Sequence, residues 1–314
     1  MENNYTDLFY GPVFSRRFKY SLGIDLIPYK NCSYDCIYCQ LGRTTIKTVE
    51  RKSFKNLNIV DFKKSLFEKI KREDTIDYLT FSGLGEPTLS TELKGLIKAA
   101  KEVSDIPVLV LTNGSLLFIN EVFEDLKNAD ALKISLDAPN ADVFKVINRP
   151  HESIEYEDTL KGLKNICEFF NGNIFIEIML LKNINDSKEN LFQFKNILNQ
   201  LKSTNIKKIQ INTPYRPSGV EEVYPPDEET LKEALRVLDF DSEIIKPADS
   251  KFKKEGDIFL RDKIIEICRR RPSTIKDLGS STGASPNEII KHVNILLNEN
   301  KLKSKIYKEG RYYF

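Results

Sequence analysis

The chain has 314 residues, of which 40% are hydrophobic and 30% charged, and its formal net charge is +2. This is the composition of an ordinary globular protein, and the length allows more than one folded unit. It contains no run of about eighteen apolar residues, and residues 1–7 lack the apolar segment of a signal peptide. The five cysteines do not make a secreted disulfide framework. We therefore expect a cytoplasmic protein with no membrane partner.

Apolar runs and amphipathic segments alternate over residues 1–245, which we expect to form one domain. Such alternation is typical of parallel β/α units joined by right-handed crossovers. We therefore predict an α/β fold, a partial (β/α)6 TIM-like barrel that is open on one side. Strands are expected at 23–27, 76–82, 108–111, 131–134, 174–179 and 206–212, with helices near 61–71, 93–103, 119–126, 153–170, 191–201 and 227–238.

A second domain is expected at 256–314, after a linker at 246–255. Three helices are predicted in it, near 258–271, near 274–280 and from Ser285 onward, where Ser285, Pro286 and Glu288 make a capping box with proline at the first helical position. Two short strands at 302–307 and 311–314 then form a hairpin. This order resembles a winged helix-turn-helix domain.

Charge divides the two parts of the chain. Residues 251–314 hold fifteen Lys or Arg and eight Asp or Glu, net +7; subtracting these from the whole-chain totals of 48 and 46 leaves 33 and 38, net −5. The basic part either binds nucleic acid, binds a protein or peptide, or docks onto its own acidic barrel. Its candidate phosphate contacts are Arg269, Arg270, Arg271, Lys291, Lys301, Lys303, Lys305, Lys308 and Arg311.

Three cysteines lie within eight residues, at Cys32, Cys36 and Cys39. Three thiolates leave a tetrahedral zinc or an iron–sulfur cubane one ligand short. The remaining candidates, His151, His292, Cys167 and Cys268, lie more than a hundred residues downstream and have no paired ligand spacing, and Cys167 and Cys268 sit on apolar helix faces. A [4Fe-4S] cluster with one open iron fits best, ahead of zinc or unligated thiols.

This C-x3-C-x2-C spacing, with an aromatic before the third cysteine, resembles the radical S-adenosylmethionine (SAM) superfamily. The resemblance implies that the open iron binds SAM and that an electron from the cluster cleaves SAM to methionine and a 5′-deoxyadenosyl radical. Tyr38 matches the position whose side chain lies near the adenine.

A glycine-rich turn follows the strand expected at 76–82. Glycine lets the backbone approach a ligand closely, and proline stiffens the exit from the turn. Gly83, Gly85, Glu86 and Pro87 resemble the family's GGEP loop, which offers backbone and carboxylate to the SAM amino group. Leu84 departs from that pattern, because it stands where the first glycine usually is. Without the cysteines, the segment would be an ordinary strand-to-helix turn.

Polar residues follow the next two strands, where ligands bind in parallel α/β sheets. Asn113 follows the strand at 108–111, and Ser135 and Asp137 follow the strand at 131–134. Ser135 and Asp137 resemble the ribose-contacting region of radical SAM enzymes. The alternative is that these side chains only cap helices.

The wider resemblance, over about residues 8–215, is to a subgroup near the wyosine tRNA-modification synthases. It rests on the segments 11–17, 22–26, 40–44 and 148–151. Wyosine synthases carry extra cysteines for a second cluster, whereas Cys167 and Cys268 are single. We therefore expect one cluster, and the wyosine reaction itself is in doubt.

Arg16, Arg17, Arg149 and His151 are candidate substrate contacts. Arginine suits carboxylate or phosphate recognition, and histidine can move a proton near neutral pH. The alternatives are a surface turn at 15–17 and a helix-stopping loop at 148–150.

The sequence thus predicts a radical SAM enzyme with a [4Fe-4S] cluster and SAM as cofactors, acting on RNA, particularly tRNA. Alternatives are a peptide-modifying or protein-modifying enzyme, a glycyl-radical-activating enzyme, or an iron–sulfur winged-helix transcription regulator. Expected partners are an RNA or protein substrate and an electron donor such as flavodoxin or ferredoxin.

Overall fold

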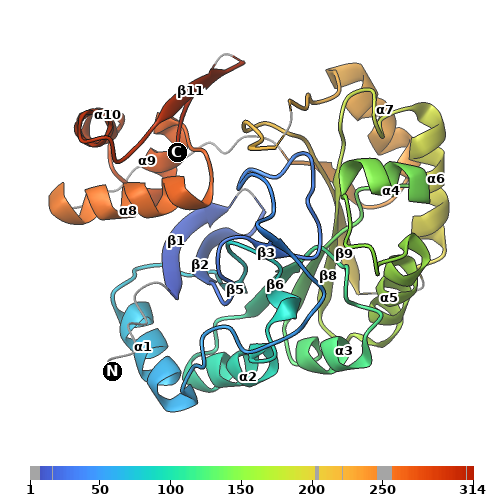
Figure 1. Cartoon of the computed structure of the whole chain (residues 1–314), viewed down its shortest axis with the longest axis horizontal. Helices are drawn as coiled ribbons and strands as arrows, with labels where there is room; N and C mark the ends of the chain where they lie inside the picture. The colour runs from blue at the N-terminus through green and yellow to red at the C-terminus, as the bar shows by residue number, and fades with distance from the viewer. Residues whose placement is uncertain (1–7, 16, 202–204, 221, 246–256, 309) are drawn as a thin grey trace.

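The computed structural model describes residues 8–15, 17–201, 205–220, 222–245, 257–308 and 310–314 (Figure 1). The strands of its central sheet are β1 (Phe9–Ser15), β2 (Lys19–Ile24), β5 (Tyr78–Phe81), β6 (Val108–Thr112), β7 (Ala131–Ser135), β8 (Asn173–Met179), β9 (Ile206–Asn212) and β10 (Ser242–Ile244). Among the described residues these eight strands pair in the order in which they are named. β1 runs antiparallel to β2, and every later pair is parallel. The predicted α/β class and partial TIM-like barrel are thereby confirmed.

Helices cover the outer face of this curved sheet (Figure 1). They are α1 (Ile59–Lys71), α2 (Leu93–Val103), α3 (Asn120–Leu126), α4 (Ala141–Ile147), α5 (Tyr156–Phe169), α6 (Lys188–Asn199) and α7 (Glu228–Leu238). Except in α4, their apolar faces pack against outward strand residues such as Leu132, Ile176 and Ile211, all fully buried in the main core. α4 instead packs in two smaller clusters, with Tyr34 and with Ile37. Because strand side chains alternate, the intervening residues point to the inside of the barrel.

The inside of the barrel is apolar toward the amino ends of the strands. Phe18, Leu109 and Ala131 are buried there, and Tyr78 and Phe175 pack against them. Phe18 lies edge-on to both of those rings, with centroid distances of 5.7 and 5.1 Å. This apolar layer closes one end of the barrel, so a ligand would enter from the carboxyl ends of the strands.

Several elements differ from the sequence prediction. The first strand expected at 23–27 ends at Ile24, because the Asp25 carboxylate accepts a bond from Ile27 N at 3.2 Å and turns the chain. β1 was not expected, and neither was the short helix α4. The helix predicted at 153–170 begins at Tyr156, since the hydroxyl of Ser153 instead bonds to His151 Nδ1 at 2.9 Å.

Residues 257–314 form a second unit with its own core, which we call the C-terminal unit. Its elements are α8 (Asp257–Arg270), α9 (Ile275–Thr282), α10 (Pro286–Asn298), β11 (Ser304–Tyr307) and β12 (Gly310–Tyr313). The order of three helices and a hairpin agrees with the expectation, whereas the winged-helix class and the domain boundaries remain predictions. The expected linker at 246–255 lies outside the described residues. In the part of the chain that is described, no helix combines the length and apolarity needed to cross a membrane.

Candidate active site

The three cysteines lie on one segment, residues 31–42, which we call the cysteine loop. It begins at the short strand β3 (Asn31–Cys32), which pairs with β4 (Ile46–Lys47). Cys39 N donates to Cys36 O at 3.0 Å, which closes a tight turn between those two cysteines. Ile37 N donates to the carbonyl of Ile147 at 2.9 Å, so the end of α4 supports the loop. The three half-buried thiols are thus presented by one fixed segment.

Hydrogen-bond donors and a lysine surround the sulfurs. Asn113 Nδ2 lies 3.5 Å from Cys32 Sγ, and Asn148 Nδ2 lies 3.5 Å from Cys36 Sγ. Burial lowers the pKa of Lys30, but the neighbouring thiolates, Cys39 first, outweigh burial and the net direction is upward. Hydrogen bonds and positive charge beside thiolates stabilise them and tune an iron–sulfur centre.

Burial holds Cys32 and Cys36 in the protonated thiol form when no metal is bound. Burial, with a further contribution from Glu86, raises the pKa of Cys32 to about 12. Buried thiols become ligands when a metal displaces their protons. Among the described residues no three His, Cys, Asp or Glu side chains are arranged to hold a metal ion as they stand. The donor set, three thiols with amide and ammonium groups, is nevertheless of the kind that an iron–sulfur cluster needs.

The segment 83–87, which we call the glycine loop, follows β5 and packs directly against the cysteine loop. A Cβ at Gly85 would lie 2.1 Å from the carbonyl oxygen of Asn31, so only glycine permits this approach. Glu86 N donates to the same oxygen at 3.1 Å. The two segments that the sequence assigned to the cluster and to SAM are therefore joined through their backbones.

The carboxylate of Glu86 is used inside the chain. It is 2% exposed, and its Oε1 accepts from Thr88 N at 3.1 Å and from the hydroxyls of Thr88 and Thr112, both at 2.7 Å. Its Oε2 accepts from Asn113 N at 2.8 Å. Burial raises the pKa of Glu86, against the effect of these bonds. Glu86 therefore fixes the end of β6 against the glycine loop, and Pro87 starts a buried 3-10 turn behind it.

Asp137 stands at the centre of a second cluster of polar contacts. Its Oδ2 accepts from the Tyr38 hydroxyl and, at 3.3 Å, from Asn148 Nδ2; its Oδ1 accepts from Met179 N at 3.0 Å. Burial raises the pKa of this carboxyl. Asp137 does not cap α4, whose N-cap is Asn140.

Several of the predicted cofactor residues meet at one hollow. A cavity of about 20 Å³, large enough for one water molecule, is lined by Asn113, Ser135 and Asp137 and on its other side by Leu160 and Leu163 of α5. The side chain of Asn113 also donates to Ser33 Oγ at 3.0 Å, which ties the end of β6 to the cysteine loop. The carboxyl ends of β6 and β7 thus converge beside the cysteines, as the strand pattern predicts.

The substrate candidates are divided between two places. Arg16 lies outside the described residues. Arg17 reaches the inside of the barrel and pairs with Glu177. Arg149, with φ +45°, and His151 lie along the cysteine loop, where His151 N donates to Ser33 O at 2.8 Å and Lys47 Nζ donates to Arg149 O at 3.4 Å.

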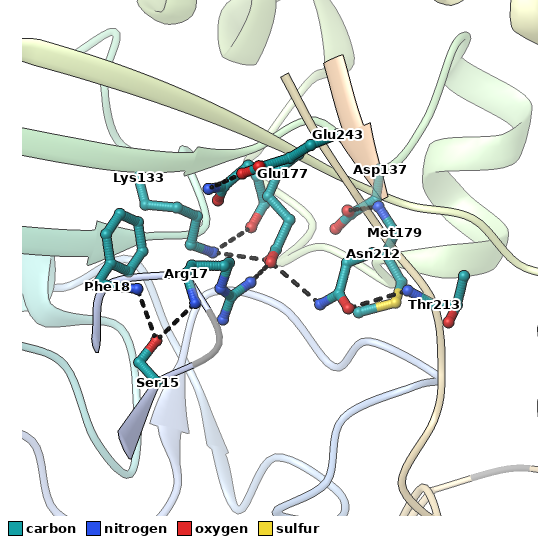
Figure 2. A network of polar contacts seen from close by, with 12 residues as sticks. Ser15, Arg17, Phe18, Lys133, Asp137, Glu177, Met179, Asn212, Thr213 and Glu243 are labelled. Carbon is teal, nitrogen blue, oxygen red and sulfur yellow. Dashed lines mark hydrogen bonds and ion pairs between the residues drawn. The ribbon is translucent and has the colours of Figure 1, made fainter. Parts of the chain in front are cut away.

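Inside the barrel the sequence reading missed three residues, Lys133, Glu177 and Asn212, which with Arg17 form what we call the polar layer (Figure 2). Glu177 Oε1 accepts from Lys133 Nζ at 3.1 Å, and Glu177 Oε2 accepts from Asn212 Nδ2 at 3.1 Å. Burial, with a contribution from Arg17, lowers the pKa of Lys133 to about 8. The signal was present in the sequence, because Lys133 and Glu177 interrupt otherwise apolar strands.

Comparisons with known proteins agree with this geometry. The family model described as the radical SAM superfamily matches residues 26–194. The UPF0026 protein MJ1312 of Methanocaldococcus jannaschii is 33% identical over 317 residues, which is 97% of this chain and 94% of that protein. A protein named GTPase Obg from Brachyspira hyodysenteriae is 34% identical over 95% of this chain, but the chain spans only 43% of its length.

More distant matches cover only part of the chain. A probable dual-specificity RNA methyltransferase RlmN of Shouchella clausii is 24% identical over 58% of this chain and 52% of that protein. Among solved structures, TYW1 with a lysine-pyruvate adduct bound aligns with a TM-score of 0.51 and 19% identity, over 70% of this chain and 72% of that chain, which shows a shared fold. Enzymes of the matched superfamily use a [4Fe-4S] cluster and SAM. Because the family model covers more than half of its residues, the chain belongs to the radical SAM superfamily.

Proposed function

We propose that this radical SAM enzyme holds one [4Fe-4S] cluster on Cys32, Cys36 and Cys39 and modifies RNA, with tRNA as the first candidate. The observation that carries the cofactor assignment is the joining of the cysteine loop and the glycine loop through Asn31 O. When bound, the cluster supplies the electron that cleaves SAM to methionine and a 5′-deoxyadenosyl radical. Superfamily membership supports an enzyme over a transcription regulator.

Residues from three elements would hold SAM beside the cysteines. Gly83, Gly85 and Pro87 shape the glycine loop, while Glu86 holds that loop against the end of β6. Asn113, Ser135 and Asp137 offer polar groups where β6 and β7 end. The hydroxyl of Tyr38 donates a hydrogen bond to Asp137, and this bond would orient the Tyr38 ring for contact with the adenine.

The polar layer would receive the substrate. It lies above the apolar layer, at the open end of the barrel, and combines ammonium, carboxylate and amide groups. Groups of this kind read the hydrogen-bonding edge of a base that has been turned out of its stack. Arg149 and His151 would contact the part of the substrate that lies along the cysteine loop.

RNA as the substrate class has two supports. The RlmN relative is named as a probable RNA methyltransferase. In addition, Lys303, Lys305 and Arg311 of the C-terminal unit are exposed, and exposed basic side chains bind phosphates. A reduced flavodoxin or ferredoxin would supply the electrons, and the cytoplasm is the reducing compartment that a thiolate-ligated cluster requires.

The cofactor assignment is tested with protein reconstituted under anaerobic conditions. We expect about four irons per chain and release of 5′-deoxyadenosine from SAM on reduction. Cys36→Ala should lose both, whereas Cys167→Ala, which removes a buried core thiol, should keep both. Full SAM cleavage by Cys36→Ala would refute the cluster assignment.

The substrate is tested in cells that lack the chain. Mass spectrometry of their RNA nucleosides should show the loss of one modified nucleoside, restored by the wild-type chain and not by Cys36→Ala. Unchanged nucleosides, with a protein that cleaves SAM in vitro, would move the substrate to the protein or peptide class.

A further inference from the structure

The C-terminal unit lies against the barrel next to β1 (Figure 1). Val13 of β1 packs against the core of the unit, so the two parts share a contact surface. Docking onto the chain's own barrel, one of the three roles expected for the basic C-terminal residues, is therefore present in this structure. The question is what the docking does.

Arg270, the last residue of α8, enters a socket on the barrel. Its NH1 lies 2.5 Å from Asp25 Oδ2, and the two side chains are only 14% and 3% exposed. The guanidinium carbon lies 3.9 Å from the centroid of the Tyr10 ring, within cation–π range. The hydroxyl of Tyr10 is in turn bonded to Ser82 Oγ at 2.6 Å.

Two glycines make room for this socket. A Cβ at Gly23 would lie 2.0 Å from the ring of Tyr10. A Cβ at Gly83, whose φ is +155°, would lie 2.1 Å from Asp25 Cγ. A side chain at Gly23 would collide with Tyr10, and a side chain at Gly83 would collide with Asp25. Glycine at these two positions therefore leaves Tyr10 and Asp25 free to contact Arg270.

The socket is connected to the glycine loop by Asp25. Leu84 N lies 3.2 Å from Asp25 Oδ2 and 3.3 Å from Oδ1, so this carboxylate holds the backbone of the loop while it pairs with Arg270. Burial raises the pKa of Asp25 and the charge of Arg270 opposes that shift. A buried carboxylate without its partner is strongly unfavourable, so loss of Arg270 would disturb the group that holds Leu84.

A second contact leads to the cysteine loop. Asp277 of α9 accepts from the Tyr215 hydroxyl at 3.0 Å and pairs with Arg216 at 3.3 Å. A few residues further on, Gly219 N donates to Cys39 O at 3.0 Å and Ser218 Oγ donates to Ile37 O at 2.7 Å. The C-terminal unit therefore holds two segments that each contact the candidate cofactor site.

We propose that Arg270 is a positioning residue for SAM: through Asp25 it fixes the backbone of the glycine loop, so that the C-terminal unit completes the cofactor site. The inference rests on the proposed function, in which the glycine loop binds SAM. The positive charge of the C-terminal unit by itself suggests only a role in substrate affinity. The inference adds a second role for the unit, in holding the cofactor site.

The test compares reconstituted full-length variants. Arg270→Gln removes the charge, and Arg270→Lys keeps it without the planar group. Lys276→Gln is the control, because it removes one positive charge from an exposed side chain on α9 of the same unit. SAM affinity is measured by equilibrium dialysis and by the change in the electron paramagnetic resonance spectrum of the reduced cluster when SAM is added. KM for SAM and kcat are measured separately.

We expect Arg270→Gln to weaken SAM binding and raise KM about tenfold, with kcat at saturating SAM nearly unchanged. Arg270→Lys should recover part of the loss, which would show that the effect of the glutamine variant is not misfolding. Lys276→Gln should match the wild type. Wild-type SAM affinity in both Arg270 variants would overturn the inference alone. A wild-type protein that binds no SAM would overturn the proposed function and the inference with it.

Discussion

Glu86→Gln replaces one oxygen of a carboxylate whose two oxygens both accept hydrogen bonds inside the chain. The amide oxygen can keep the three bonds from Thr88 and Thr112. The amide nitrogen then faces Asn113 N, which donates to the carboxylate at 2.8 Å. Two donors meet there without an acceptor, at a side chain that is 2% exposed.

The cost follows from these two buried donors. Leaving a buried polar group unsatisfied costs about 1–3 kcal/mol, so two such donors should lower the free energy of unfolding of Glu86→Gln by about 2–6 kcal/mol. For a chain of this size that corresponds to a fall in Tm of about 3–9 °C. SAM affinity should fall as well, because the glycine loop and the end of β6 lose their common anchor.

Thermal unfolding followed by circular dichroism measures the first effect, and equilibrium dialysis with SAM measures the second. Glu121→Gln is the matched control, since Glu121 is exposed in the first turn of α3. If Glu86→Gln kept the wild-type Tm and lost SAM affinity, the carboxylate would contact SAM directly and the reasoning from its internal bonds would be wrong.

Two further predictions concern the polar layer and the unpaired cysteines. Because burial lowers the pKa of Lys133 to about 8, activity that depends on the charge of Lys133 should fall as pH rises through about 8. In Lys133→Arg this fall should move to higher pH, because guanidinium stays charged. Identical pH–rate profiles of the two proteins would contradict a role for the charge of Lys133. Cys167→Ala and Cys268→Ala should each keep the full iron content and lose about 1–2 kcal/mol of stability, measured by urea unfolding, whereas loss of half the iron would reveal a second cluster.

The repeating part of the fold was predictable because its signals are local. The strands β6, β7 and β8 appear in the sequence as mainly apolar runs and β9 as a mixture of isoleucines and polar residues, and the structure places all four within a residue or two of the expected ranges. A parallel strand buried on both faces needs such a run, whatever its neighbours are. The cysteine spacing was equally readable, since three ligands of one centre must come from one short loop.

β1 was missed because its stability is not local. The strand contains Gly11 and Pro12, residues that sequence reading assigns to turns. It forms by pairing antiparallel with β2 and by contact of Val13 with a core more than 240 residues away in the chain. No pattern within the strand reports those partners.

The polar layer was missed for a related reason. A charged residue in an apolar strand signals either a barrel interior or an error in the strand assignment, and only the partner decides. The partner of Lys133 is Glu177, on the next strand, and the partner of Glu177 is Asn212, one strand further. The sheet brings these residues together, whereas the sequence separates them by 44 and 35 positions.

The charge of the C-terminal unit shows how one pattern can serve two purposes. Residues 251–314 carry a net charge of +7 against −5 for the rest of the chain, and attraction between the two parts is as natural a consequence as attraction to phosphate. The structure separates the two uses by burial: Arg270 is largely covered and pairs with Asp25, whereas Lys303 and Lys305 are exposed. Salt should therefore weaken nucleic-acid binding at the exposed lysines far more than the docking of the unit, because buried pairs are screened much less than exposed ones.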